Sequence, residues 1–242
     1  GKRHMKIMVT GGCGFIGHHF VDHIIKTTNH EVVVIDKLSY ASMGLDRLRD
    51  PGLLFHPRLK VFAADFAKPF PEGLRREIGE DVNVIVHMGA ESHVDNSIKD
   101  PVSCFENNVG GTVEMLEYAR SLPDLKLFFY FSTDEVFGPA PGETAYKEWD
   151  RHKPTNPYSA SKSAADKVLI HSYPDKKRPG SRFYIHARNI SSAVVFLMET
   201  GEVGEKYNIV GDREVDNLEL AQMIAKYVGK PLKYEMVDFH RL

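Results

Sequence analysis

Short apolar runs alternate with amphipathic stretches along most of this chain, and this alternation is the feature that most limits its fold. Strands are expected at residues 6–10, 31–36, 59–63, 83–88 and 126–131. Helices are expected at residues 15–28, 45–49, 101–120 and from 158 onward. Strands and helices in this order predict a parallel, doubly wound sheet, because a parallel crossover needs a connecting helix. We therefore expect an α/β fold with a Rossmann-type doubly wound parallel sheet.

The last third of the chain differs from the part before it. Its pattern predicts a helix at residues 187–199, a strand at 206–210 and a helix at 217–228. These elements are too few for an independent core, so we expect a small C-terminal α/β lobe packed on the main domain. The expected division is 5–167 and 168–242. Residues 1–4 are expected to precede the native start at Met5, and we set them aside from the fold prediction.

Composition excludes several classes of protein. The chain of 242 residues has a formal net charge of −2, so nothing indicates a nucleic-acid partner or a membrane surface. It has no apolar run long enough to span a bilayer, and we expect no membrane association. Its two cysteines, Cys13 and Cys104, form no disulfide framework and favour a reducing, cytoplasmic setting. Histidines are frequent, but their spacing predicts no metal site.

A glycine-rich turn follows the first expected strand. Gly11, Gly14 and Gly17 stand three residues apart between that strand and the first helix. Such a turn lets backbone N–H groups approach a pyrophosphate at a helix N-terminus. Asp36 ends the second strand, where a carboxylate binds both ribose hydroxyls of NAD and repels the 2′-phosphate of NADP. Lys37 comes next and leaves the choice between the two cofactors less sharp.

Two adjacent acids follow the fifth expected strand. Asp134 and Glu135 come after Ser132 and Thr133, at the carboxyl end of residues 126–131. Ligands of open α/β sheets bind at this end, and paired carboxylates there are costly unless something uses them. The alternative is a solvated loop in which one acid caps a helix.

Tyr158 and Lys162 lie four residues apart in an expected helix, and therefore on one face. A phenol has a pKa near 10, too high for a base at neutral pH. A neighbouring ammonium and an oxidised nicotinamide ring would both lower that pKa. The pair is therefore a candidate for proton transfer beside a bound NAD.

Five segments together resemble one known family. They are residues 10–17, 36–40, 87–95, 132–138 and 158–162. The resemblance is to the extended short-chain dehydrogenase/reductase family, and within it to the nucleotide-sugar 4,6-dehydratases, especially those acting on dTDP-glucose. It runs from about Met5 to Lys167 and resumes from about Ile170 to the end. It implies an NAD-binding Rossmann domain at 5–167 and a small substrate-binding lobe at 168–242.

The resemblance also implies roles for the candidate residues. Tyr158 would be the base for oxidation of the C4 hydroxyl, with Lys162 beside it, and Thr133 would hydrogen-bond the C4 oxygen. Glu135 would then remove the C5 proton while Asp134 protonates the leaving C6 hydroxyl. Further cofactor contacts are expected from Phe15, Ile16, Asp65, Phe66 and Ala90. Substrate contacts are expected from Ser92, Asn108 and Arg182, although Asn108 could equally be a helix-face amide.

The sequence departs from the family after the Tyr158 helix. Relative to the family, we expect a sixth strand and several dozen residues to be missing near 167–169, where residues 168–173 read as a later strand, and we expect further residues beyond 242. Either a segment is omitted or the chain is a shortened relative; we favour the first, because a lost strand would open an apolar sheet edge.

Two other functions remain as alternatives. One is a nucleotide-sugar 4-epimerase or decarboxylase, whose relatives generally lack the Asp134–Glu135 pair. The other is a non-catalytic NAD-binding sensor, in which Tyr158 or Lys162 tends to be lost. The resemblance also implies a homodimer, formed through the helices at 101–120 and 158–167.

Overall fold

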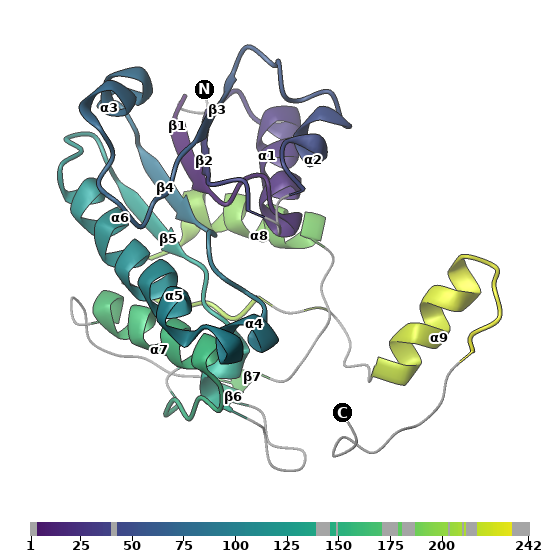
Figure 1. Cartoon of the computed structure of the whole chain (residues 1–242). Coiled ribbons are helices and arrows are strands. Elements are labelled where there is room, and N and C mark those ends of the chain that lie inside the picture. Colours follow the sequence, from purple (N-terminus) through teal and green to yellow (C-terminus); the bar gives the residue numbers. More distant parts are fainter. Residues whose placement is uncertain are drawn as a thin grey trace.

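A five-stranded parallel sheet forms the centre of the computed structural model (Figure 1). The structure describes residues 4–39, 43–138, 146–148, 150–170, 179–180, 187–202, 204–209, 211 and 217–233. The strands are β1 (Lys6–Thr10), β2 (Glu31–Asp36), β3 (Leu59–Ala63), β4 (Val84–His87) and β5 (Leu127–Tyr130). Their order is β3-β2-β1-β4-β5, and every neighbouring pair is parallel. The predicted doubly wound Rossmann-type sheet is confirmed, with strand bounds within one residue of those expected.

Helices cover both faces of the sheet, as Figure 1 shows. One face carries α1 (Phe15–Thr27), α2 (Asp46–Arg49) and α8 (Ala187–Thr200). The other carries α3 (Glu72–Ile78) and α6 (Gly111–Arg120). Near the carboxyl ends of the strands, α7 (Pro157–Ile170) packs against α4 (Val94–Lys99) and α5 (Pro101–Phe105). The result is a three-layer α/β/α molecule.

Two separate cores explain why the strands are apolar at nearly every position. On the α1 face, alternate strand residues pack with helix residues, among them Val9, Val34, Val86, Phe20, Ile24 and Val194. On the α6 face, the intervening strand residues pack with the other helices, among them Met8, Val33, Ile85, Ile78 and Met115. Strands buried on both faces need apolar side chains at both parities, and this is the pattern from which they were predicted.

The long helix expected at 101–120 is continuous but not regular. Between α5 and α6 lies η2 (Glu106–Gly110), a π-helical turn. The apolar side chains of the long helix do not share one face, since Tyr118 is buried in the core while Val102 and Val113 are exposed. The wider π turn shifts the phase of the helix, and a constant period of 3.6 residues therefore misplaces the side chains after it.

The C-terminal third differs from its prediction in several places. Residues 206–209 form no strand, and the strand expected from residue 168 is instead, as far as Ile170, the end of α7. A short antiparallel pair joins β6 (Tyr146–Lys147) to β7 (Pro179–Gly180), and neither strand was predicted. The predicted helices are present as α8 and as α9 (Asn217–Tyr227), which lies apart from the sheet in Figure 1. The division into two lobes stays a prediction.

Strand β5 ends the sheet on the side where a sixth strand was expected. Among the described residues it pairs only with β4, and its four residues, 127–130, are each partly exposed. This is the open apolar edge that loss of a sixth strand would produce.

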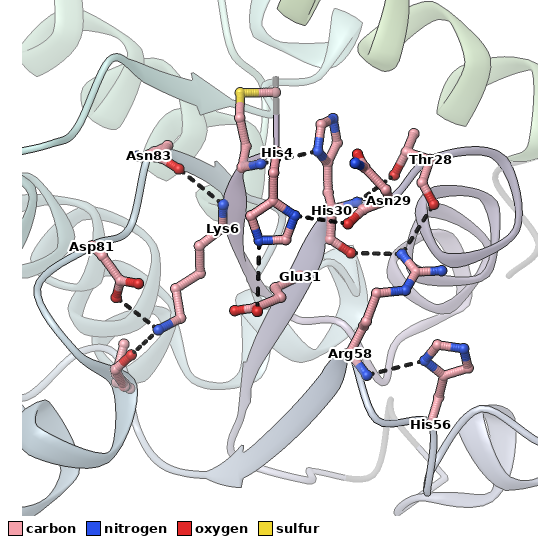
Figure 2. A network of polar contacts seen from close by, with 12 residues as sticks. His4, Lys6, Thr28, Asn29, His30, Glu31, His56, Arg58, Asp81 and Asn83 are labelled. Carbon is pink, nitrogen blue, oxygen red and sulfur yellow. Dashed lines mark hydrogen bonds and ion pairs between the residues drawn. The ribbon is translucent and has the colours of Figure 1, made fainter. Parts of the chain in front are cut away.

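A polar network joins the amino ends of the strands, opposite the candidate site (Figure 2). Lys6 donates from Nζ to Asp81 at 2.8 Å and to the Ile78 carbonyl at 2.6 Å. Arg58 donates to the carbonyls of Ile25, Thr28 and His30, at 2.7–3.0 Å, and so closes the C-terminal end of α1. These contacts stabilise the end of the sheet that lies opposite the candidate site.

No helix of the described residues is long and apolar enough to cross a membrane.

Candidate active site

The predicted site residues gather at one edge of the sheet. Gly11 follows β1, Asp36 ends β2, Asp65 lies two residues past β3, Ala90 follows β4, and residues 131–135 follow β5. Because all five strands are parallel, these segments share the edge formed by the carboxyl ends of the strands. Parallel pairing thus brings together residues that are more than a hundred positions apart in sequence.

The glycine turn is shaped for close backbone approach. Gly11 has φ +70°, and a Cβ there would lie 2.9 Å from the Gly89 Cα. A Cβ on Gly17 would lie 2.1 Å from the Gly11 carbonyl oxygen. Gly14 caps α1 without a side-chain hydrogen bond, and the first turn of α1 holds no acid. The opening N–H groups of α1 can therefore bind an anion, and the turn fits the pyrophosphate of a dinucleotide.

Two neighbours of the glycine turn, Phe15 and Ile16, stand at the start of α1. Phe15 is 64% exposed and Ile16 is 37% exposed, although both are apolar. The Arg47 guanidinium lies 6.0 Å from the centre of the Phe15 ring. Their exposure beside the pyrophosphate site is consistent with the cofactor contacts expected of them.

Asp36 is held in place by its own surroundings. Its Oδ2 accepts from the Cys13 N–H at 3.0 Å, and its Oδ1 accepts from the Leu38 N–H at 2.8 Å. Each oxygen keeps a further lone pair, so the carboxylate can still accept from ribose hydroxyls. Lys37 points elsewhere, since its Nζ donates to the Asn107 side chain at 2.8 Å. This contact engages the Lys37 ammonium, which would otherwise be available to the 2′-phosphate of NADP.

Asp65 and Phe66 have different roles in the structure. Asp65 accepts from the Ala67 N–H at 2.9 Å and is partly exposed at the site edge. The ring of Phe66 is buried between two glycines, where a Cβ on Gly89 or on Gly111 would come within 2.5 Å of it. Its edge-on contact with His87 fixes the ring in the core. A cofactor can therefore meet Phe66 through its backbone, and the ring has a packing role.

The threonine and the two carboxylates of residues 133–135 lie beside Tyr158. They begin η3 (Asp134–Phe137), a 3₁₀ turn that the Thr133 hydroxyl caps by accepting from the Glu135 N–H at 3.3 Å. The pKa of Tyr158 is raised to about 12, chiefly by burial, with a hydrogen bond from Thr133 acting to lower it and the charges of Glu135 and Asp134 acting to raise it. All three side chains thus act on the same phenol.

The expected lowering of the Tyr158 pKa is not produced by the protein alone. Lys162 lies one turn further along α7, but its Nζ donates to the Phe131 carbonyl at 2.5 Å and sits 4.5 Å from the centre of the Tyr130 ring. Burial lowers the pKa of Lys162 to about 8, against the opposing influence of Asp166 and Cys104. The spacing of Tyr158 and Lys162 predicted a lowered pKa for Tyr158. In the structure, burial and the charges of the two acids raise it instead.

Asn108 connects three parts of the site. Its Oδ1 accepts from the Glu91 N–H at 2.8 Å, and its Nδ2 donates to the Glu91 carbonyl at 3.1 Å and to Ser161 at 2.9 Å. It is 2% exposed, so it is no helix-face amide. Ser92, next to Glu91, is exposed at this edge. Arg182 lies outside the described residues.

Sequence reasoning missed a chain of hydrogen bonds around His87. Thr10 and His87 Nδ1 are 2.6 Å apart, and His87 Nε2 and Thr112 are 3.1 Å apart. Thr112 donates to the Asn108 carbonyl, so it accepts from His87 Nε2, which therefore carries a proton. The Gly89 N–H donates to Thr10, and with His87 neutral the Thr10 hydroxyl donates to Nδ1. Burial, and then the Lys162 charge, lower its pKa to about 3.

Asn156 is a second residue that was missed. Its Oδ1 accepts from the Ser159 N–H at 2.8 Å at the start of α7, and its Nδ2 lies 3.5 Å from Glu135 Oε2. An asparagine before a proline at a helix start was a readable cap signal, but its reach to Glu135 was not.

Comparison with known proteins agrees with this geometry. Residues 8–177 match the GDP-mannose 4,6 dehydratase family. The chain belongs to that family. It is an extended short-chain dehydrogenase/reductase of the nucleotide-sugar 4,6-dehydratase group, most like dTDP-glucose 4,6-dehydratase, as the five motif segments predicted.

Individual relatives support the same placement. The chain is 32% identical to the low-salt glycan biosynthesis protein Agl12 of Haloferax volcanii, over 93% of this chain and 83% of that protein. It is 31% identical to dTDP-glucose 4,6-dehydratase of Escherichia coli, over 89% and 74%. The crystal structure of DesIV, a dTDP-glucose 4,6-dehydratase from Streptomyces venezuelae with NAD and TYD bound, matches at 27% identity and a TM-score of 0.78, over 94% and 82%.

The alignment lengths bear on the shortened segment. The Agl12 alignment runs over 266 residues but takes in only 93% of a chain of 242, so about 40 of its positions have no counterpart here. The chain is thus shorter than Agl12 within the aligned region. The expected place of the missing positions near residues 167–169 stays a prediction.

Proposed function

We propose that this chain is an NAD-dependent 4,6-dehydratase of a nucleotide-activated hexose, with dTDP-glucose the expected substrate. The observation that carries the proposal is the contact of Thr133 with Tyr158, with Asp134 and Glu135 close enough to act on the same phenol. A dehydrogenase or epimerase needs the tyrosine but has no use for two further carboxyls. Elimination of water needs both a base and an acid.

The residues of the glycine turn and the strand ends would hold NAD. The N-terminus of α1 would meet the pyrophosphate, Asp36 the adenosine ribose, and Asp65 the adenine. When bound, NAD⁺ would accept the C4 hydride of the sugar and later return it to C6. Its positive ring would also favour the Tyr158 phenolate, which opposes the effect of burial on the pKa of that residue.

The chain's own residues would move the protons. Tyr158 would take the C4 hydroxyl proton, with Thr133 hydrogen-bonded to the same oxygen. A C4 ketone makes the C5 proton acidic, and Glu135 would remove it. Asp134 would give its proton to the C6 hydroxyl, which leaves as water, and the proton held by Glu135 would return to C5 when the hydride reaches C6. The two acids differ in solvation, since Asp134 is exposed and Glu135 is partly buried, while their division into base and acid rests on the family resemblance.

Mass spectrometry tests the reaction directly. The protein is incubated with NAD⁺ and, separately, with dTDP-glucose, UDP-glucose, GDP-mannose and UDP-N-acetylglucosamine. Loss of one water from one sugar is the expected result, and it identifies the nucleotide. Unchanged mass with all four would contradict dehydration. NMR of the same samples then tests epimerisation, the alternative that mass does not detect.

We further propose a homodimer formed through residues 101–120 and 158–167. Exposed apolar side chains on neighbouring helices support it, namely Ile98 on α4, Val102 and Phe105 on α5, and Val113 on α6. Such a patch on a globular protein is typical of a contact surface.

A cytoplasmic location also remains a proposal, supported by two cysteines that are free and buried.

A further inference from the structure

A buried carboxylate with no role in the proposed reaction lies one turn beyond Lys162. Asp166 is 8% exposed and Lys162 is 3% exposed, and both belong to α7. Residues four apart on a helix lie on the same face. A buried carboxylate is costly unless charged or polar groups surround it. The surroundings of Asp166 therefore call for an explanation.

Three separate segments of the chain meet at Asp166. From residues 150–153, His152 places Nε2 3.3 Å from Asp166 Oδ2, and its Nδ1 lies 2.7 Å from the Ser163 hydroxyl of α7. From residues 204–209, Lys206 donates to the same Oδ2 at 3.2 Å. The His152 side chain is 5% exposed and that of Lys206 is 21% exposed. The carboxylate is thus shared among partners in a largely dry environment.

Asp166 acts electrostatically on the surroundings of Lys162. Burial lowers the pKa of Lys162, and Asp166 is the largest opposing influence. Burial also raises the pKa of Tyr130, and Asp166 raises it further. The Lys162 ammonium lies over that same Tyr130 ring. The field of Asp166 therefore reaches the position that the ammonium occupies.

The other groups that face Lys162 cannot replace Asp166. The Cys104 thiol on α5 is buried, and burial raises its pKa, so it is neutral at physiological pH. Tyr130 and the Phe131 carbonyl of the β5 end are also neutral. His87 on β4 is kept neutral by burial. Among the described residues that act on Lys162, Asp166 supplies the negative charge.

We propose that Asp166 is a positioning residue whose carboxylate keeps the Lys162 ammonium charged where it meets the Phe131 carbonyl, and that Lys206, which forms an ion pair with the same carboxylate, offsets part of its charge. The inference rests on the proposed function only in giving Lys162 a part in the reaction. Residues 204–209 would thereby influence the protonation of Lys162, because Lys206 neutralises part of the negative charge that Lys162 would otherwise experience.

The test is the pKa of Lys162 in two variants, measured by NMR on protein labelled with [ε-¹³C]lysine. The Lys162→Met variant assigns the resonance. Asp166→Asn keeps the shape of the side chain and should lower the Lys162 pKa by about one unit, the usual effect of losing a nearby opposite charge. Lys206→Met should raise it, because the competing cation is gone. A merely structural role would not shift the two variants in opposite directions.

Two control variants break ion pairs far from α7. Asp81→Asn removes a contact of 2.8 Å with Lys6, and Lys26→Met removes one of 2.6 Å with Asp22. Neither should move the Lys162 resonance. An unchanged Lys162 pKa in Asp166→Asn, or shifts in the same direction in Asp166→Asn and Lys206→Met, would overturn the proposal. If Asp166→Asn does not fold, the direction of the Lys206→Met shift decides alone.

Kinetics separates this inference from the proposed function. In an active enzyme, the pKa that governs the alkaline limb of the kcat/KM profile should be lower by about one unit in Asp166→Asn and higher in Lys206→Met. If the wild-type protein removes water from no nucleotide sugar, the proposed function fails. The NMR titration, which needs no substrate, still decides the role of Asp166.

Discussion

Asp134 and Glu135 are neighbours in sequence but lie in different surroundings. Glu135 is partly buried, and Asn156 Nδ2 lies 3.5 Å from its Oε2, whereas Asp134 is exposed. Neutral Asn156 can hydrogen-bond the Glu135 carboxylate without adding charge. One acid can therefore be positioned as a base while its neighbour exchanges protons with solvent.

Replacing Glu135 by Gln tests this division of roles. The amide keeps the size of the side chain but cannot take a proton, so water elimination should slow by about 10²–10⁴-fold. Binding of NAD and oxidation at C4 should persist, and NADH absorbance should accumulate in a single turnover. Glu117→Gln, a surface variant on α6, serves as the control and should behave as wild type. Near-normal turnover of Glu135→Gln would show that another group is the base.

At the scale of the elements, the chain of hydrogen bonds around His87 links β1, β4 and the η2–α6 helix. Each bond in it has a fixed direction, from the Gly89 N–H to the Asn108 carbonyl. Asn108 then binds the Glu91 backbone and α7. The π turn contains Asn107 and Asn108, and both are buried. Strand ends and catalytic helix are thereby kept in register.

The neutral state of His87 predicts a pH dependence of stability. Burial lowers its pKa to about 3 in the folded protein, while the unfolded chain keeps the ordinary value of 6.5. The stabilisation is complete above pH 6.5 and is lost as the pH falls from there toward 3, because only the unfolded chain takes up the proton. The free energy of unfolding should fall by about 1.4 kcal/mol per pH unit from this residue.

Urea unfolding at several pH values measures that slope. His87→Gln should be less stable at neutral pH but should lose this part of the pH dependence. His23→Gln, on the partly exposed side of α1, should keep it. An equal slope in wild type and His87→Gln would contradict a neutral His87.

For the whole molecule, we predict that the exposed apolar patch on α4, α5 and α6 forms the contact of the proposed dimer. A charge in the middle of a dimer contact would be buried without a partner and would be strongly unfavourable. Val102→Asp should therefore convert a dimer into monomers in sedimentation velocity. Phe55→Asp is the matched control, since Phe55 is 89% exposed and lies outside the patch. A monomeric wild type, or a dimeric Val102→Asp, would contradict the proposed interface.

Much of the fold and part of the site could be predicted from local patterns. The five strands were readable because both faces of the sheet are covered, which favours apolar residues at nearly every position. The glycine turn and Asp36 were readable because a dinucleotide site imposes fixed spacing. Residues 206–209 were misread as a strand, since a short apolar run does not show whether a neighbouring strand exists to pair with it.

The sequence by itself determined the parallel sheet, the glycine turn, the Tyr158–Lys162 pair and the adjacent acids after β5. Each of these depends on residues close together in the chain, where spacing alone fixes geometry. Only the tertiary structure decided that the Lys162 amine turns to the Phe131 carbonyl, that the Phe66 ring is core, and that Asp166 gathers His152 and Lys206. The contact of Lys206 with Asp166, for example, joins residues 40 positions apart, and no local pattern encodes which segments meet.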